Sequence, residues 1–195
     1  MPIGINGNGT ITGVTVGGLP DGIVDTDMLA ANAVTAAKAS GIGGKFTSYA
    51  IIVDQKSNTT EGGTFTSGAW RTRDLNTELY DPDGIVSISS NQFILTAGSY
   101  LIEWSCPAMR CGRHQSRLYD ITASASIQSG KSTVSDTGLD GDQNDSAGAA
   151  RITISASNTY EIQHRCSTTE ASIGLGSAAD FGGEIFTFVK IFKEA

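Results

Sequence analysis

A ten-residue segment close to the C-terminus constrains the fold most, because it predicts a strand that is apolar on both faces. From Glu184 to Lys193 the sequence reads EIFTFVKIFK, and alternate side chains of a strand point to opposite faces. One face would carry Phe186, Phe188 and Phe192. The other would carry Ile185, Val189 and Ile191. One face of an antiparallel sheet usually meets water, so either a loop or another subunit must cover the second face, and we favour a subunit.

The same two-residue period begins near Phe46 and predicts a module built entirely of strands. In the segment from Tyr100 to Cys106 the apolar residues alternate with Glu103 and Ser105, and the segment from Tyr160 to Cys166 alternates in the same way. The chain has 24 Gly and only 4 Pro, which is typical of short strands joined by glycine-rich turns. We therefore predict that residues 46–195 form an all-β, antiparallel jelly-roll sandwich of about seven or eight strands.

The first 45 residues follow a different pattern. Residues 1–23 are rich in Gly, Thr and Asn, and their isolated apolar residues predict an extended segment that is stable only when it pairs with another chain. These candidate anchor residues are Ile3, Ile5, Ile11, Val14 and Val16. Residues 24–45 predict a short helical neck over residues 25–40, capped by Asp25 or Thr26, and a glycine hinge. A disordered tail is the alternative for residues 1–23.

Charge and composition exclude several classes of protein. With 13 basic and 20 acidic residues the net charge is −7, which argues against a nucleic-acid partner because such proteins need a basic surface. No apolar stretch approaches the ~20 residues of a membrane span, so we expect no membrane partner. Three Cys do not make a disulfide framework, and we expect synthesis in a reducing cytosol.

Two groups of residues resemble metal sites, but we predict no metal and no cofactor. Four acidic or amide residues could offer oxygen ligands to calcium, although the bidentate Glu of a calcium loop is missing, and a solvated acidic loop is favoured; they are Asp140, Asp142, Asn144 and Asp145. Five Cys and His residues could supply zinc ligands if their strands were neighbours; they are Cys106, Cys111, His114, His164 and Cys166. Their alternation favours buried side chains instead.

Enzymatic activity is not predicted, although a glycan-degrading enzyme remains an alternative. Such an enzyme needs two carboxylates that face each other across a groove. Glu103, Glu161 and Glu170 are available, but nothing in the sequence pairs them.

Positive charge and aromatic rings provide candidate contacts to partners. Arg113, His114 and Arg117 concentrate positive charge in an acidic protein. They could hold anionic groups of a surface glycan or pair with acids across a subunit interface. Trp70 and Tyr80 adjoin loops, where they could stack on sugar rings or pack beneath the loops.

The segment NQFILTAGSYLI, residues 91–102, resembles the strand–Gly–Tyr–strand unit of the tumour-necrosis-factor and complement globular-head jelly rolls. That resemblance covers residues 46–195 and implies a homotrimer whose terminal strand lies near the three-fold axis. The trimer hypothesis favours subunit pairing for the charged residues and gives these candidate interface residues: Phe186, Phe188, Val189, Ile191, Arg113, His114 and Arg117.

A second resemblance lies mainly in two segments near the N-terminus. GLPDGI (residues 18–23) and LAANAVTAAK (residues 29–38) resemble linker segments of bacteriophage tail fibres, and RHQSRLY (residues 113–119) with HRCSTT (residues 164–169) resembles the heads that such proteins carry. The resemblance implies a structural virion protein: a trimeric fibre anchored to another virion component by its N-terminus, with a head that binds a polysaccharide or protein of the host surface. A capsid head fibre or decoration protein is the alternative.

Overall fold

The computed structural model describes residues 4–5, 11–12, 45–138 and 142–195, and the chain divides into two units, Met1–Gly44 and Lys45–Ala195. In the first unit, β1 (Gly4–Ile5) pairs antiparallel with β2 (Ile11–Thr12), which sets Ile5 opposite Ile11. The predicted helix over residues 25–40 and the anchor candidates Ile3, Val14 and Val16 lie outside the described residues.

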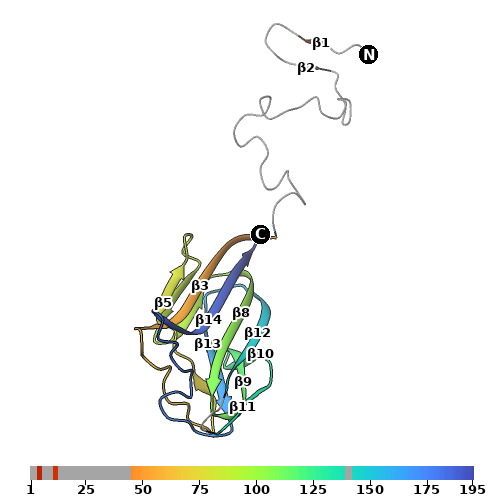
Figure 1. The fold of residues 1–195 in the computed structure, drawn as a ribbon. Coiled ribbons are helices and arrows are strands. Elements are labelled where there is room, and N and C mark those ends of the chain that lie inside the picture. The colour runs from red at the N-terminus through yellow and green to blue at the C-terminus, as the bar shows by residue number, and fades with distance from the viewer. Residues whose placement is uncertain (1–3, 6–10, 13–44, 139–141) are drawn as a thin grey trace. The chain divides into compact units, whose positions relative to one another are not determined.

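The second unit contains two antiparallel sheets (Figure 1). One has five strands in the order β12-β8-β14-β3-β5; in chain order these are β3 (Phe46–Lys56), β5 (Thr77–Tyr80), β8 (Gly98–Met109), β12 (Gln143–Ile154) and β14 (Glu184–Glu194). The other sheet has seven strands. Five of them follow the order β10-β9-β13-β7-β6, while β11 pairs with β9 and β4 pairs with β13. In chain order these strands are β4 (Arg71–Thr72), β6 (Val86–Ser89), β7 (Gln92–Leu95), β9 (Gly112–Asp120), β10 (Ala125–Ser129), β11 (Thr133–Ser135) and β13 (Asn158–Cys166). The predicted all-β jelly-roll sandwich is confirmed.

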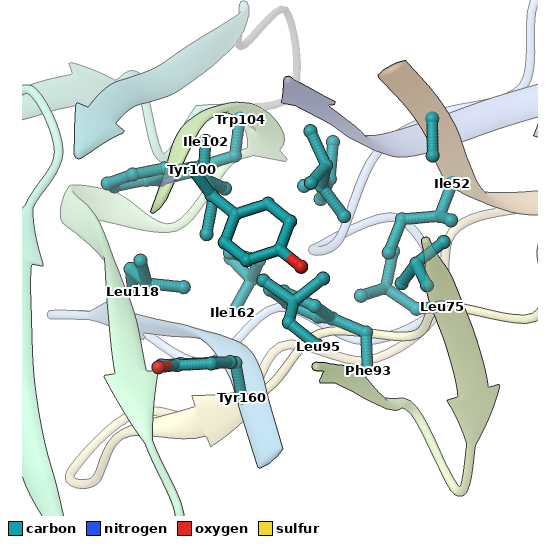
Figure 2. Packing of buried hydrophobic residues seen from close by; sticks show 14 of the residues in the cluster. Ile52, Leu75, Phe93, Leu95, Tyr100, Ile102, Trp104, Leu118, Tyr160 and Ile162 are labelled. Carbon is teal, nitrogen blue, oxygen red and sulfur yellow. The ribbon is translucent and has the colours of Figure 1, made fainter. Parts of the chain in front are cut away.

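The core lies between the two sheets and is filled by the alternating positions of their strands (Figure 2). The inward residues of β8 include Tyr100, Ile102 and Trp104, and Tyr160 and Ile162 meet them from β13. Each of these side chains is at most 3% exposed. Burying a large apolar side chain stabilises the fold by roughly 1.5–3 kcal/mol, so these strands contribute much of its stability.

Helices are absent from the described part of the chain, so none there could cross a membrane.

The last strand is buried on its core side, and a loop also covers one end of the strand. Val189 and Ile191 are fully buried in the core. A bulge lies between Ile185 and Phe188 in the pairing of β14 with β3. Phe186 is buried so closely beneath Gly176 that a Cβ on that glycine would overlap its ring. A loop therefore covers this end of the strand.

The bulge interrupts the alternation beside Phe186, which the sequence pattern placed on one face with Phe188 and Phe192. A bulge inserts one extra residue and breaks the two-residue alternation. Phe188 and Phe192 are half-buried, and they lie on the outer face of the five-stranded sheet, opposite the core.

Candidate functional site

Four aromatic rings cluster on the outer face of the five-stranded sheet, and we call them the aromatic face: Phe46, Tyr49, Tyr80 and Phe192. The ring centroids of Tyr49 and Tyr80 lie 4.7 Å apart, those of Phe46 and Phe192 5.2 Å, and those of Tyr49 and Phe192 6.3 Å. Phe46 is 40% exposed, and Tyr49 and Tyr80 are each 43% exposed. The rings therefore form one contiguous, partly exposed aromatic surface.

Strand register explains why these rings meet. Tyr49 of β3 lies opposite Phe192 of β14, which lies opposite Leu101 of β8. Side chains directly opposite each other in an antiparallel pair lie about 5 Å apart. In the next row of the same face, Lys190 lies opposite Glu103 and its Nζ is 3.8 Å from the Glu103 carboxylate. The aromatic face is thus bordered by an exposed ion pair.

Beyond this ion pair, the same outer face contains an apolar hollow of about 630 Å³. Its floor includes Phe188, Ala147 and Ala149, and the segment 129–131 forms one wall. Lys131 N holds this segment by donating to Ala147 O at 2.7 Å. The apolar hollow therefore lies on the β12–β8–β14 side of the sheet, and the aromatic face lies on the β14–β3–β5 side.

The predicted interface residues separate into three places. Of the four on β14, Phe188 faces outward and lines the apolar hollow, whereas Phe186, Val189 and Ile191 are buried within the protomer. Arg113, His114 and Arg117 lie on β9 of the other sheet. The buried residues have no surface to offer a second subunit, so the outward side of the last strand is the side of Phe188 and Phe192.

The two predicted glycan contacts also lie on different sheets. Tyr80 belongs to the aromatic face. Trp70 lies over the outer face of the seven-stranded sheet, where the guanidinium carbon of Arg117 is 4.1 Å from the centre of its ring. Trp70 lines a second hollow of about 640 Å³, which we call the arginine pocket, together with Arg113, Gln115 and Arg165. Arg165 was missed by sequence reasoning because its nearness to Arg113 depends on strand register.

Two histidines and two cysteines gather inside the sandwich beside the arginine pocket. His114 Nδ1 and His164 Nε2 are 2.9 Å apart and share a hydrogen bond, and Cys111 and Cys166 belong to one buried cluster with Phe65. Burial lowers the pKa of His114 to about 4, and burial also lowers the pKa of His164 well below its usual range. Both rings are therefore neutral at pH 7. Within the described residues no three His, Cys, Asp or Glu side chains form a metal site.

The calcium candidates in the described part hold neighbouring protein groups. Asp142 Oδ1 accepts from Asp136 N at 2.7 Å, and Asp145 Oδ2 accepts from Ser105 Oγ at 2.6 Å. Asn144 donates to Val134 O at 2.9 Å. Asp140 lies outside the described residues.

The candidate catalytic carboxylates are not placed as a pair. Glu103 lies on the outer face of the five-stranded sheet beside Lys190. Glu161 is buried on β13 and accepts from Thr72 Oγ1 at 2.9 Å. Glu170 forms a backbone bridge with Phe65. They belong to different parts of the sandwich.

Arg73 is a buried structural residue that sequence reasoning did not identify. It is 1% exposed, and its guanidinium donates to Thr187 Oγ1 at 3.0 Å, Pro107 O at 3.2 Å and Leu175 O at 2.9 Å. Burial lowers its pKa. Because charged residues are almost never fully buried, no sequence pattern indicated this position.

Comparisons with known proteins support the fold and leave the function open. No protein-family model matches the chain, and no curated protein matches it. Among solved structures, Eiger TNF from S. frugiperda is 11% identical with a TM-score of 0.50, and the match covers 75% of this chain and 92% of that one. The globular domain of zebrafish complement 1qA protein is 14% identical with a TM-score of 0.48 over 74% and 95% of the chains.

A bacteriophage structure is also similar. PRD1 vertex protein P5 is 12% identical with a TM-score of 0.44, and the match covers 78% of this chain and 100% of that one. At 11% identity, the likeness to Eiger TNF shows the fold alone, a jelly-roll sandwich.

Proposed function

We propose that this protein is a structural component of a bacteriophage virion: a homotrimeric fibre whose N-terminal segment anchors it to the particle and whose jelly-roll head binds the host surface. The observation that carries the proposal is the aromatic face. A monomer would leave this cluster of rings in water beside an apolar hollow on the same sheet.

A closed trimer uses both surfaces at once. In a cyclic trimer each subunit contacts its neighbour through two different patches, one for each side. The aromatic face and the apolar hollow lie on opposite sides of one sheet face and differ in shape, since one presents rings and the other receives side chains. In the proposed trimer the aromatic face of each subunit packs against the hollow side of the next.

The energy of such a contact is favourable. An aromatic side chain can bury 150–250 Å², so a ring that is 43% exposed, such as Tyr49, still offers roughly 80 Å² to a partner. At about 25 cal/mol per Å², covering that area stabilises the complex by about 2 kcal/mol per ring. The rings of three subunits together offset the entropy lost on association.

The resemblance of residues 18–38 to phage fibre linkers supports a place in the virion. Within this segment, Ile5 and Ile11 lie opposite each other in the short β1–β2 pair. We propose that this segment pairs with another virion protein.

A capsid head fibre or decoration protein is the second candidate, and the shortness of the neck predicted from the sequence favours it. A helix of about 15 residues spans only about 22 Å, whereas a tail fibre needs reach.

Labelling of virions with an antibody raised against residues 45–195 tests the location. Electron microscopy should show label at the tail for a tail fibre and over the shell for a capsid fibre. The virion proposal would be refuted if purified virions bound no antibody and mass spectrometry detected none of this chain in them.

A further inference from the structure

Three arginines of the seven-stranded sheet lie side by side on its outer face. Arg113 and Arg117 alternate with Gln115 along β9, and Arg165 of β13 lies opposite Gln115. Arg165 is therefore the diagonal neighbour of both other arginines, and such neighbours lie within reach of long side chains. Within the described residues, no carboxylate lies at ion-pair distance from these three.

Trp70 gives this cationic surface an aromatic wall. Arg117 covers the indole at 4.1 Å and lies 4.7 Å from the centre of the Tyr119 ring. Arg117 Nε also donates to Gln163 Oε1 at 2.8 Å. Stacking and hydrogen bonding therefore fix Arg117, which holds the half-buried indole in place at the edge of the arginine pocket.

The rest of the pocket is polar and already ordered. Gln115 Nε2 donates to Gly130 O at 3.0 Å and to Ser132 Oγ at 3.1 Å, which leaves its carbonyl oxygen available. Arg113 and Arg165 are exposed and line the same hollow of about 640 Å³. The site thus combines two available guanidinium forks, an indole, and amide and hydroxyl groups.

We propose that the arginine pocket binds an acidic saccharide, with a sugar carboxylate held by Arg113 and Arg165 and a sugar ring against Trp70. Arginine forks match a carboxylate in geometry, and the C–H face of a sugar ring is apolar enough to pack on an indole. A net charge of −7 disfavours long polyanions such as nucleic acid, so the local positive charge selects a short acidic unit.

The position of the acid group follows from the surrounding charges. Beyond Arg113, an adjoining hollow is lined by Asp136 and Asp142, whose carboxylates repel an anion. The acid group therefore lies on the Arg165 side of Arg113. Assigning this sugar to the surface of a bacterial host rests on the proposed function; binding itself does not.

Tryptophan fluorescence of the purified full-length chain tests the proposal, because Trp104 is 3% exposed and Trp70 lines the pocket. Titration with trigalacturonic acid should change the emission, and maltotriose and inorganic phosphate should not. Arg113→Gln and Arg165→Gln should each weaken the affinity by roughly 10- to 100-fold, since each removes a hydrogen bond between two charged groups. Titration calorimetry should show a similar loss of affinity for trigalacturonic acid in the Trp70→Ala variant.

Lys45→Gln is the matched control, because it removes one exposed positive charge outside the pocket and should leave the affinity unchanged. Equal affinity of the wild type and the two arginine variants, equal binding of maltotriose, or no binding of trigalacturonic acid would each overturn the assignment. A negative result leaves the virion proposal intact, because antibody labelling tests it separately.

Discussion

At the residue scale, the contact between Trp104 and Gly148 shows how closely the core is fitted. The two residues lie directly opposite each other on β8 and β12, and the indole Nε1 donates to Ser116 Oγ at 2.8 Å. Because the indole occupies the space above the glycine, even a methyl group at position 148 would overlap Trp104 Cζ2.

We therefore expect Gly148→Ala to lower the free energy of unfolding by about 1–3 kcal/mol, the usual cost of overpacking a core. Urea denaturation at pH 7.5 measures it. The matched control is Gly182→Ala, where an added Cβ meets no atom within 4 Å. A Gly148→Ala protein as stable as the control would contradict the packing described for Trp104.

The buried His114–His164 pair predicts a loss of stability in mild acid. Burial, with the nearby Arg73 cation, lowers both pKa values, and the pKa of His114 falls to about 4 although Asp145 and Asp142 act to raise it. Below pH 6.5 the two histidines are protonated in the unfolded chain but stay neutral in the folded chain. The free energy of unfolding is therefore highest above that pH and falls as the pH drops toward 4.

The expected slope is up to about 1.4 kcal/mol per pH unit for each histidine between pH 6.5 and 5. These are the only two His in the chain, so urea denaturation across this range reports on them. His164→Gln should be less stable at pH 7.5 but should show a shallower slope. An unchanged urea midpoint of the wild type from pH 7 to 5 would show that the pair is not held neutral.

At the element scale, Arg73 links β8 and β14 to the segment that joins β13 to β14. Its three hydrogen bonds reach Pro107, Thr187 and Leu175. Removing the guanidinium leaves these acceptors buried and unsatisfied, and each unsatisfied group costs about 1–3 kcal/mol.

Arg73→Met should therefore destabilise the protein by about 3 kcal/mol or more, although methionine fills much of the same space. Arg71→Met is the control, because Arg71 is exposed and surface substitutions usually change stability by about 0.5 kcal/mol or less. Thermal and urea unfolding of both variants give the comparison. If Arg73→Met and Arg71→Met have the same free energy of unfolding, the hydrogen bonds of Arg73 do not stabilise the contact between these elements.

Strand alternation could be predicted from the sequence wherever it was regular. The inward sets of β8 and β13 were predicted correctly, because period-two patterning directly gives the buried face. The bulge in β14 could not be predicted, since nothing in EIFTFVK identifies the extra residue. The arginine pocket depends on the pairing of β9 with β13. Its members Arg113 and Arg165 are 52 residues apart along the chain, so only the strand register brings them together.

At the scale of the whole molecule, the aromatic face should control assembly without controlling folding. Tyr49 is 43% exposed, so a charge there is tolerated in the monomer but costs free energy when a partner covers it. Tyr49→Asp should yield a folded monomer with an unchanged circular dichroism spectrum. Val134→Asp is the control, because Val134 is 60% exposed on the other sheet and should keep the wild-type assembly.

Sedimentation equilibrium of the full-length chain at micromolar concentration is the most direct test of the trimer. The account predicts a single species at three times the chain mass of 20.3 kDa, unaffected by dilution through the low micromolar range. A species at 20.3 kDa over the same range would contradict it, because the aromatic face and the apolar hollow would then both remain in water.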